Sequence, residues 1–550
     1  MRLLILFLSA CMLIIACNPS TKNTDADDGL SSFNTTRLEG YIKTLSSDDF
    51  TGRKPFTDGE TKTLNFLENE LKTIGLEPGN GESYRQSVPM VSIKCEADSI
   101  MTIKGAKSKF DLKGYKDYVL WTQHAEGASL EESEIVFAGY GIVAPEYNWN
   151  DYEGIDVKGK IVLVFVNDPG FGTGDSTFFK GNTMTYYGRW TYKFEEAARQ
   201  GAKGCLVIHD DVPASYPFAV VQNSWNNSKL YLGDEHSVNT SCAVEGWVSL
   251  PALKKIFEAS GFNYAEKLSA AHKQGFRAEA MNLKASTKIK ATPVYNTSAN
   301  VVAQLKGSTH PDEYIIYTAH WDHLGIGKAD EKGDSIYNGA MDNGTGTAGL
   351  LEMANAFMSL KTKPQRTVVF LFVTAEEQGL LGSAYYAANP IFPKEKTVAN
   401  INIDGLNIKG MVKDISLVGI GQSDLEDYLR QECSKVNRYA TNDPLPSAGY
   451  YFRSDHFNFA KIGIPALYTH SGIDHVEKGK EYGEQLDADY RAKNYHKPSD
   501  EFDAATWDLN GSIDDLKLLF QVGKRISMES TWPQWKEGSE FKGIRAGYMK

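Results

Sequence analysis

The chain has 550 residues, of which 41% are hydrophobic and 23% charged, and its formal net charge is -12 at pH 7. Because a single hydrophobic core rarely grows beyond about 250–300 residues, this length predicts two or three domains. The acidic balance and the absence of any basic run argue against nucleic acid or an anionic membrane surface as the main partner.

The N-terminus has the features of an export signal. Arg2 precedes an apolar run, residues 3–16, that is too short for a membrane span of about 20 residues. The sequence LIIAC, ending at Cys17, resembles a bacterial lipobox, in which cleavage leaves a lipidated cysteine at the new N-terminus. LSAC, ending at Cys11, is a second candidate with a shorter apolar core, and a simple cleaved signal is a third. We predict an exported, membrane-anchored lipoprotein on the periplasmic or cell-surface face, attached through lipidated Cys17.

Helical spacing of apolar residues follows from Leu38 to Ile74, with Gly75 expected as the C-terminal cap of a helix. Residues 115–290 instead have a pattern typical of β-strands. Strand-like runs are EIVFAGYGIV, GKIVLVFVND and GCLVIHD, and a helical stretch lies near residues 192–200. The order FAGYGIVAPEYNWNDYEGIDVKGKIVLV, then EEAARQGAKGCLVI, resembles the protease-associated domain. This small β-rich module is inserted into several zinc peptidases and sorting receptors, and by itself it implies no chemistry.

From residue 300 onward the pattern is strand, loop and helix. Strand-like runs are EYIIYTAH, TVVFLFVTAE, VANINIDG and IPALYTHS, and GTAGLLEMANAFMSL is an amphipathic helix. Strands that alternate with helices predict an α/β domain with a mainly parallel mixed sheet, covered by helices on both faces.

Acidic and imidazole side chains stand where these strands end. The expected rim residues are His320, Asp322, Asp342, Glu376, Glu377 and Asp404. Ligands of open α/β sheets bind at the carboxyl ends of the strands, so these side chains should lie close together. One such carboxylate is commonly a turn or cap residue, but burying several without a cation would be very unfavourable.

Five motifs carry a family resemblance: TAHWDHLG, GAMDNGTG, VTAEEQGLLGS, NINIDG and YHKPSD. In this order they resemble the co-catalytic dizinc aminopeptidases, a family that includes bacterial leucyl aminopeptidases, aminopeptidase Y, glutamate carboxypeptidase II and the catalytically silent transferrin receptor. The N-terminal segment LSSDDFTGRKPFTDGETKTLNFLENELKTIGLEP shares in the resemblance. The resemblance implies a fold of the zinc exopeptidase type with an inserted protease-associated domain.

Carried over position by position, the resemblance implies two zinc ions. His320, Asp342 and Asp404 would bind one ion. Asp342, Glu377 and His496 would bind the other, so that Asp342 bridges the pair. Histidine and carboxylate ligands suit zinc, and open positions on each ion would leave room for water and substrate.

Two further acids would serve the reaction. Glu376 would be the general base that deprotonates a metal-bridging water and passes the proton to the leaving amine. Asp322, two residues along the strand from His320, would point to the same face and accept a ring N–H of that histidine. The resemblance also implies a cis peptide bond between Asp342 and Asn343.

Plainer interpretations stay open for some of these residues. Asp342 could simply cap the following helix. His496 competes as a ligand with three histidines of the same third of the chain: His456, His470 and His475. Three other histidines are interpreted as structural: His124, His209 and His323.

The predicted function is an exported dizinc metallo-aminopeptidase that acts on peptides, with no nucleic acid as partner. Alternatives are a carboxypeptidase of the glutamate carboxypeptidase type, a receptor-like binding protein, and a one-zinc glutaminyl cyclase. A complete ligand set with Glu376 counts against the binding protein, which has no use for a general base. The predicted boundaries are 1–17 for the signal, 18–32 for a flexible tether, 33–114 for the N-terminal part of the peptidase domain, 115–290 for the protease-associated domain, 291–530 for the catalytic domain and 531–550 for a C-terminal tail.

Overall fold

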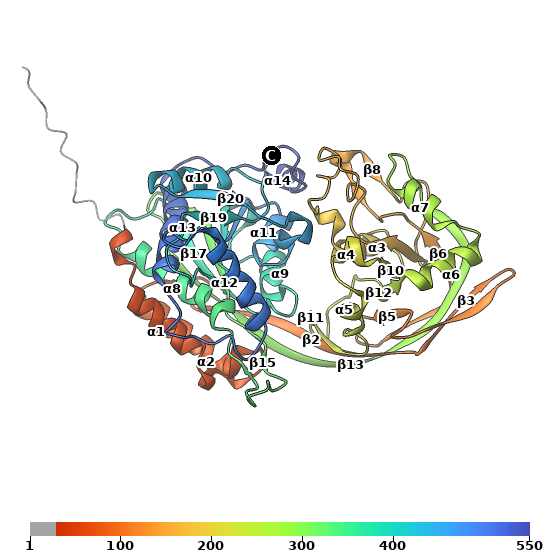
Figure 1. Cartoon of the computed structure of the whole chain (residues 1–550). Coiled ribbons are helices and arrows are strands. Elements are labelled where there is room, and N and C mark those ends of the chain that lie inside the picture. Colours follow the sequence, from red (N-terminus) through yellow and green to blue (C-terminus); the bar gives the residue numbers. More distant parts are fainter. Residues whose placement is uncertain (1–28, 550) are drawn as a thin grey trace, which may run out of the picture.

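The computed structural model describes residues 29–549 and consists of two bodies that lie side by side (Figure 1). We call them the main body, whose core comes from residues 38–84 and from residue 299 onward, and the inserted body, whose core comes from residues 91–289. The predicted signal and Cys17 lie outside the described residues. Within the described part, no helix combines the length and the apolar character needed to cross a membrane.

The main body is built on a mixed, mainly parallel sheet, as predicted. Its four central strands are parallel: β17 (Arg366–Val373), β14 (His310–His320), β18 (Thr397–Asn402) and β21 (Ala466–Ser471). The outer strands are β13 (Glu279–Leu305), antiparallel to β17, β19 (Asp414–Leu417), antiparallel to β21, and β20 (Tyr439–Asn442), with the short β1 (Glu77–Pro78) along β13. All eight residues of β17, RTVVFLFV, are buried, as expected for a parallel strand covered on both faces.

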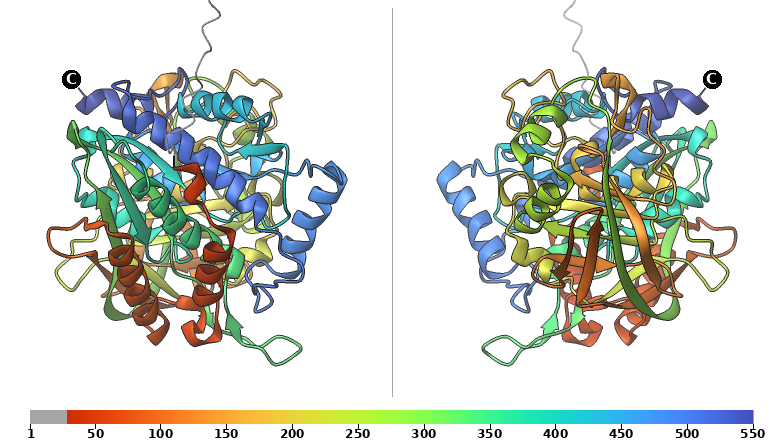
Figure 2. Two further views of the ribbon diagram at one scale, coloured as in Figure 1. Left: turned by 90° about the vertical axis from the view of Figure 1, so that its left-hand side faces the viewer. Right: turned by 90° about the vertical axis from the view of Figure 1, so that its right-hand side faces the viewer.

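Helices cover both faces of this sheet. One face packs against α1 (Thr35–Leu45), α2 (Asp58–Ile74), α8 (Gly346–Met358), α10 (Leu425–Lys435) and α13 (Asn510–Met528), several of which are visible in the left view of Figure 2. The other face packs against α9 (Leu381–Ala388) and α11 (His456–Lys461). The alternation along β17 sends Phe370 to the first face and Leu371 to the second. The predicted cap is confirmed: α2 ends at Gly75, whose φ is 92°.

The inserted body is β-rich. Its strands are β2 (Arg85–Ala97), β3 (Ile100–Gly105), β4 (Lys109–Lys113), β5 (Tyr118–Trp121), β6 (Ala128–Phe137), β7 (Val143–Ala144), β8 (Trp149–Asn150), β9 (Ile161–Phe165), β10 (Gly204–His209), β11 (Ser228–Leu232) and β12 (Val244–Ser249). Its helices are α3 (Trp190–Arg199), α4 (Asp211–Ala214), α5 (Phe218–Gln222), α6 (Leu250–Ser260) and α7 (Tyr264–Ala271). This core begins at Val91, earlier in the chain than the predicted boundary at residue 115, because β2 and β3 pair with β13.

Contacts at several places hold the two bodies together. The long strands β2 and β13 run from one body into the other, so that both belong to one continuous sheet (Figure 1). At a second place, Tyr186 of the inserted body packs its ring against Phe457 and Phe541 of the main body. Phe541 precedes α14 (Lys542–Tyr548), so the predicted C-terminal tail is packed against the rest of the protein.

Candidate active site

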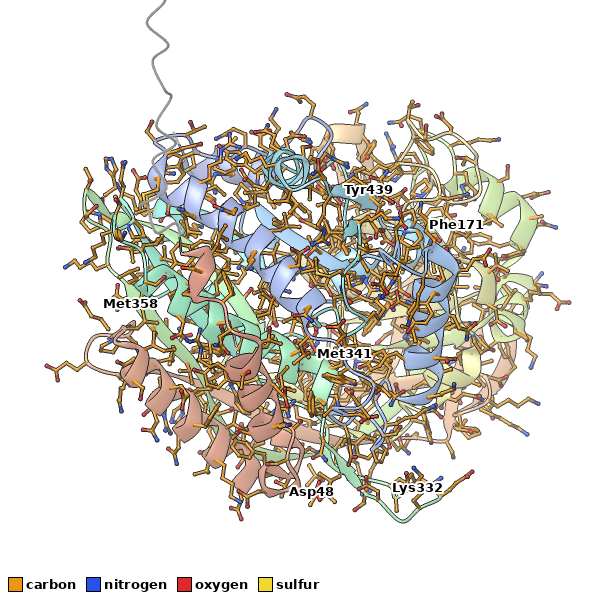
Figure 3. All side chains as sticks on the ribbon, turned by 60° about the vertical axis from the view of Figure 1, so that its left-hand side comes forward. Asp48, Phe171, Lys332, Met341, Met358 and Tyr439 are labelled. Carbon is orange, nitrogen blue, oxygen red and sulfur yellow. The ribbon has the colours of Figure 1, made fainter. Side chains whose placement is uncertain are left out.

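The predicted rim residues meet at the carboxyl ends of the central strands. His320 is the last residue of β14, Glu376 and Glu377 lie in the turn after β17, and Asp404 follows β18 by two residues. Asp342 lies in the short turn η5 (Ala340–Thr345) that leads into α8. His496 follows α12 (Lys480–Lys493). Met341, labelled in Figure 3, marks the turn that carries Asp342.

Two sets of donor atoms surround Asp342. On one side, His320 Nε2 lies 3.4 Å from Asp342 Oδ1 and 3.3 Å from Asp404 Oδ1. On the other side, His496 Nε2 lies 3.3 Å from Asp342 Oδ2 and 3.1 Å from Glu377 Oε2. Ligands held about 2.0–2.1 Å from a tetrahedral zinc ion are about 3.3–3.4 Å apart, which is close to the separations seen here. Each side of Asp342 could therefore hold one metal ion.

Other groupings of the same side chains fit an ion less well. His320, Glu376 and Asp404 come within 4.8 Å of one another, as do His323, Asp342 and Glu377. However, Glu376 Oε2 is 4.0 Å from His320 Nε2, which is longer than a tetrahedral edge. His323 Nδ1 is only 2.6 Å from Glu377 Oε1, which is a hydrogen-bond separation. These distances favour His496 over His323 as the partner of Glu377.

His323, interpreted from the sequence as structural, lies at the site itself. Its ring is fully buried and contacts the oxygen of Glu377 that faces away from His496. His323 and His496 thus lie next to opposite oxygens of the Glu377 carboxylate. The sequence signal was present in TAHWDHLG, where a second histidine follows the first by three residues.

Asp322 acts on His320 in a different way from the one expected. The strand ends at His320, so Asp322 lies in the loop beyond it, and its Oδ1 is 3.8 Å from His320 Nδ1. The backbone oxygen of Asp322, 3.2 Å away, can only accept, so Nδ1 is the donor in this contact and Nε2 faces the acidic group. The Asp322 carboxylate accepts the backbone N–H of Glu376 at 3.0 Å and so holds the turn that carries both glutamates.

Neighbouring side chains hold the acidic ligands in place. Asp404 Oδ2 accepts the hydroxyl of Ser454 at 2.6 Å, which leaves Oδ1 toward His320. Asp500 accepts the backbone N–H groups of Met341 and Asp342, both at 3.2 Å. The peptide bond between Asp342 and Asn343 is cis, as the resemblance implied.

Arg53 connects the loops of the site through hydrogen bonds from its side chain. Its guanidinium is fully buried, and it donates to four backbone oxygens: Leu45 O at 2.7 Å, Trp321 O at 2.9 Å, Asn338 O at 2.6 Å and Gly339 O at 2.8 Å. It thus connects the loop after His320 with the loop before Asp342. In the sequence this arginine lies in FTGRKP, within the N-terminal segment that shares in the family resemblance, and no pattern around it predicts its role.

The charges at the site call for a cation. Burial, reinforced by the charges of Asp404 and Glu377, raises the pKa of Glu376 well above its usual range. Burial raises the pKa of Asp322 to about 7. Burial would lower the pKa of His320, but Glu376 and Asp404 outweigh it and raise this pKa. Carboxyl groups packed this closely can all ionise only if bound cations compensate them, so the donor set fits metal ions.

Aromatic residues flank the exposed side of the site. The ring of Tyr495 stacks on His496, with centroids 3.9 Å apart. His456 is buried, stacks on Tyr468 and belongs to neither group of possible metal ligands among the described residues. His470 contacts the Tyr468 hydroxyl at 2.8 Å. Of the histidines late in the chain, His496 contacts the shared aspartate.

The chain is similar to several peptidases. Residues 300–521 match Peptidase family M28. Aminopeptidase NAALADL1 of Mus musculus is 36% identical over 113 residues, which are 20% of this chain and 14% of that protein. Glutamate carboxypeptidase 2 homolog of Caenorhabditis elegans is 21% identical over 432 residues, which are 67% of this chain and 51% of that protein. The matches thus span about half or less of these relatives.

Among solved structures, an aminopeptidase from Aneurinibacillus sp. strain AM-1 is similar with a TM-score of 0.47 and 20% identity, over 92% of this chain and 97% of that one. The segment matched to the family contains every residue of the candidate site from His320 to His496. Residues 300–521 thus carry a Peptidase family M28 domain.

Proposed function

We propose that the protein is a zinc aminopeptidase that uses two metal ions and acts on peptides outside the cytoplasm. The observation that carries the proposal is the spacing of donor atoms around Asp342. One oxygen of this carboxylate lies 3.4 Å from His320 Nε2 and the other 3.3 Å from His496 Nε2. Both separations match neighbouring ligands of tetrahedral zinc, for which about 3.3–3.4 Å is expected.

In this proposal His320, Asp342 and Asp404 hold one ion, and Asp342, Glu377 and His496 hold the other. Imidazole and carboxylate ligands suit zinc. When bound, the two ions would polarise the scissile carbonyl and make water a better nucleophile. The relatives named probable zinc metalloprotease support the choice of zinc.

Glu376 is the general base in this proposal. Its carboxylate lies beside the ligand set, 4.0 Å from His320 Nε2, and is not needed as a ligand. Burial raises its pKa above the usual range, which favours the uptake of a proton. Glu376 would take a proton from the attacking water and pass it to the leaving amine, while Asp322 holds its backbone in place.

The charge of the site favours recognition of a substrate ammonium. The acidic side chains can accept hydrogen bonds from a free N-terminus, whereas a carboxypeptidase needs cationic groups for a terminal carboxylate. Arg53 is engaged by four backbone oxygens. Arg453 donates to Ala448 O at 2.7 Å and lies over the ring of Tyr450. Relatives named as aminopeptidases support this choice.

The test compares two forms of one peptide. Acetylation of its N-terminus should stop cleavage, and amidation of its C-terminus should not. The reverse result would favour a carboxypeptidase, the second candidate, which is supported by the similarity to a glutamate carboxypeptidase homolog. Metal analysis of the purified protein should find two zinc ions per chain, and Glu376→Gln is the control for contaminating peptidases.

Export and lipidation belong to the proposal as well. They rest on the N-terminal sequence alone, in which an apolar run ends at Cys17. Cys17→Ser should release the protein from membranes or leave its signal uncleaved. Unchanged attachment would point to Cys11 or to an uncleaved apolar segment.

A further inference from the structure

A cavity of 1590 Å³ lies between the two bodies. On the main body its wall includes Glu377, Gln378, Gly379 and Leu381. On the inserted body its wall includes residues of β5, α3 and β11 and the loop at 233–241. Pockets for small molecules usually measure about 300–1,000 Å³, so this one has room for a peptide of several residues. It therefore offers a path for substrate that starts beside the candidate active site.

Strand β11 forms part of the cavity wall in the inserted body and is anchored to the main body (Figure 1). Leu230 and Leu232 pack in a cluster that includes Ala375, the residue before Glu376. Because side chains alternate along a strand, Lys229 and Tyr231 project to its opposite face. Both line the cavity, as do Leu230 and Leu232. The position of these two side chains is thus tied to the position of the active site.

Lys229 brings an unpaired positive charge to the cavity. Its Nζ lies 3.5 Å from the centre of the Trp121 ring, and among the described residues it enters no hydrogen bond or ion pair within 4 Å. The acid that acts on it electrostatically, Glu245, is occupied by donors, Trp121 Nε1 at 3.1 Å and Gln123 Nε2 at 3.0 Å. By contrast, Lys461 in the same wall is paired with a carboxylate of α3 at 2.8 Å.

Tyr231 supplies a second free donor. Its hydroxyl is buried and has no hydrogen-bond partner in the described part of the protein. A buried polar group without a partner is unfavourable, and a bound acceptor would remove that penalty. An ammonium and a hydroxyl on the same side of one strand, with an aromatic ring beneath the ammonium, suit an anionic oxygen ligand.

We propose that Lys229 and Tyr231 form a subsite for a carboxylate on the part of the peptide that leaves after cleavage. The inference rests on the proposed aminopeptidase function, in which the N-terminal residue is held near Glu376. The rest of the peptide then extends past Glu377 into the cavity. The carboxylate is either the C-terminus of a short peptide or an Asp or Glu side chain of a longer one.

The first experiment measures KM for matched peptides of two to eight residues. One pair differs by a free or amidated C-terminus, and another pair carries an internal Glu or Gln. Wild type should have the lower KM for the member that carries the carboxylate, at the peptide length that reaches the subsite. In Lys229→Gln the KM of that member should rise about tenfold, which removes the preference, and Lys229→Arg should restore it in part. Lys461→Gln, the matched control, should keep the wild-type preference.

Binding provides an independent readout. Titration calorimetry with the Glu376→Gln protein measures peptide affinity without turnover. Adding the Lys229→Gln change should weaken the binding of the carboxylate peptide by about tenfold and leave the binding of the neutral peptide unchanged. Tyr231→Phe should give a smaller loss. Equal affinity for carboxylate and neutral peptides in the Glu376→Gln protein would overturn the subsite, as would equal losses for Lys229→Gln and Lys461→Gln. Absence of cleavage of aminoacyl reporter substrates by wild type would instead overturn the proposed function, and the calorimetric result would still decide the subsite.

Discussion

Replacement of Arg53 should weaken both the fold and the metal site. Arg53 is completely buried and donates to four backbone oxygens, three of which, Trp321 O, Asn338 O and Gly339 O, belong to loops next to His320 and Asp342. Burial lowers the pKa of Arg53 to about 10, so the guanidinium still carries its charge at neutral pH. Lysine in its place keeps the charge but cannot direct hydrogen bonds to all four oxygens at once.

The size of the effect follows from those bonds. A hydrogen bond from a charged donor contributes about 1.5–3 kcal/mol, and a buried acceptor left without a donor is unfavourable by about 1–3 kcal/mol. If lysine serves two of the four oxygens, the free energy of unfolding should fall by about 2–6 kcal/mol. Arg53→Met leaves all four oxygens without a donor. Its loss of unfolding free energy should approach the total stability of an ordinary domain, about 5–15 kcal/mol, so this variant should accumulate poorly.

The assay compares Arg53→Lys with a matched control, Arg366→Lys. Arg366 is also fully buried and donates to backbone oxygens, namely Ile526 O, Ser530 O and Thr531 O, but none of these belongs to a loop that carries a candidate ligand. Urea unfolding should show losses in both variants. Competition with a zinc chelator should show weaker zinc binding in Arg53→Lys alone. Unchanged stability and zinc affinity in Arg53→Lys, or equal loss of zinc affinity in both variants, would refute the reasoning.

Three further predictions concern the ligands and the base. Glu376→Gln should lower kcat by about 10²–10⁴ while both zinc ions stay bound, and loss of an ion would show that Glu376 and Glu377 have exchanged roles. Asp342→Ala should reduce the zinc content well below two ions per chain and abolish activity, since this carboxylate faces both histidines; two retained ions would contradict a bridging role. Removal of zinc by a chelator should lower the Tm, and re-addition should restore it in Glu376→Gln as in wild type but not in Asp342→Ala, because a ligand that binds only the folded state stabilises it.

The sequence predicted the sheet and the position of the site because both depend on local patterns. β17 is a continuous apolar run, and such runs form buried parallel strands whatever the details of the rest of the chain. The residues after such strands necessarily reach the same edge of the sheet. His320, Glu377 and Asp404 could thus be grouped from the sequence, and the structure does bring them together.

The roles of Arg53 and His323 could not be predicted because they depend on long-range contacts. Arg53 reaches Trp321 O across 268 residues of sequence, and no local pattern reports such a distance. His323 looked like a core histidine because it is one by burial, yet its ring is turned toward Glu377. For Asp322, strand alternation predicts a side chain on the same face as His320. However, β14 ends at His320, so the alternation does not extend to Asp322.

The boundary of the inserted body shows why composition alone misplaces a domain edge. The residue pattern of the sequence becomes β-rich near residue 115, but strand pairing places the start of the inserted body's core at Val91. β2 pairs with β13 along thirteen consecutive residues, from Ala97 opposite Ile289 to Arg85 opposite Val301. Val301 in turn pairs with Phe372 of β17, the strand that leads to Glu376. The inserted body is therefore fastened to the sheet that carries the active site, and excision at residues 115 and 290 would cut through its own core and through β13.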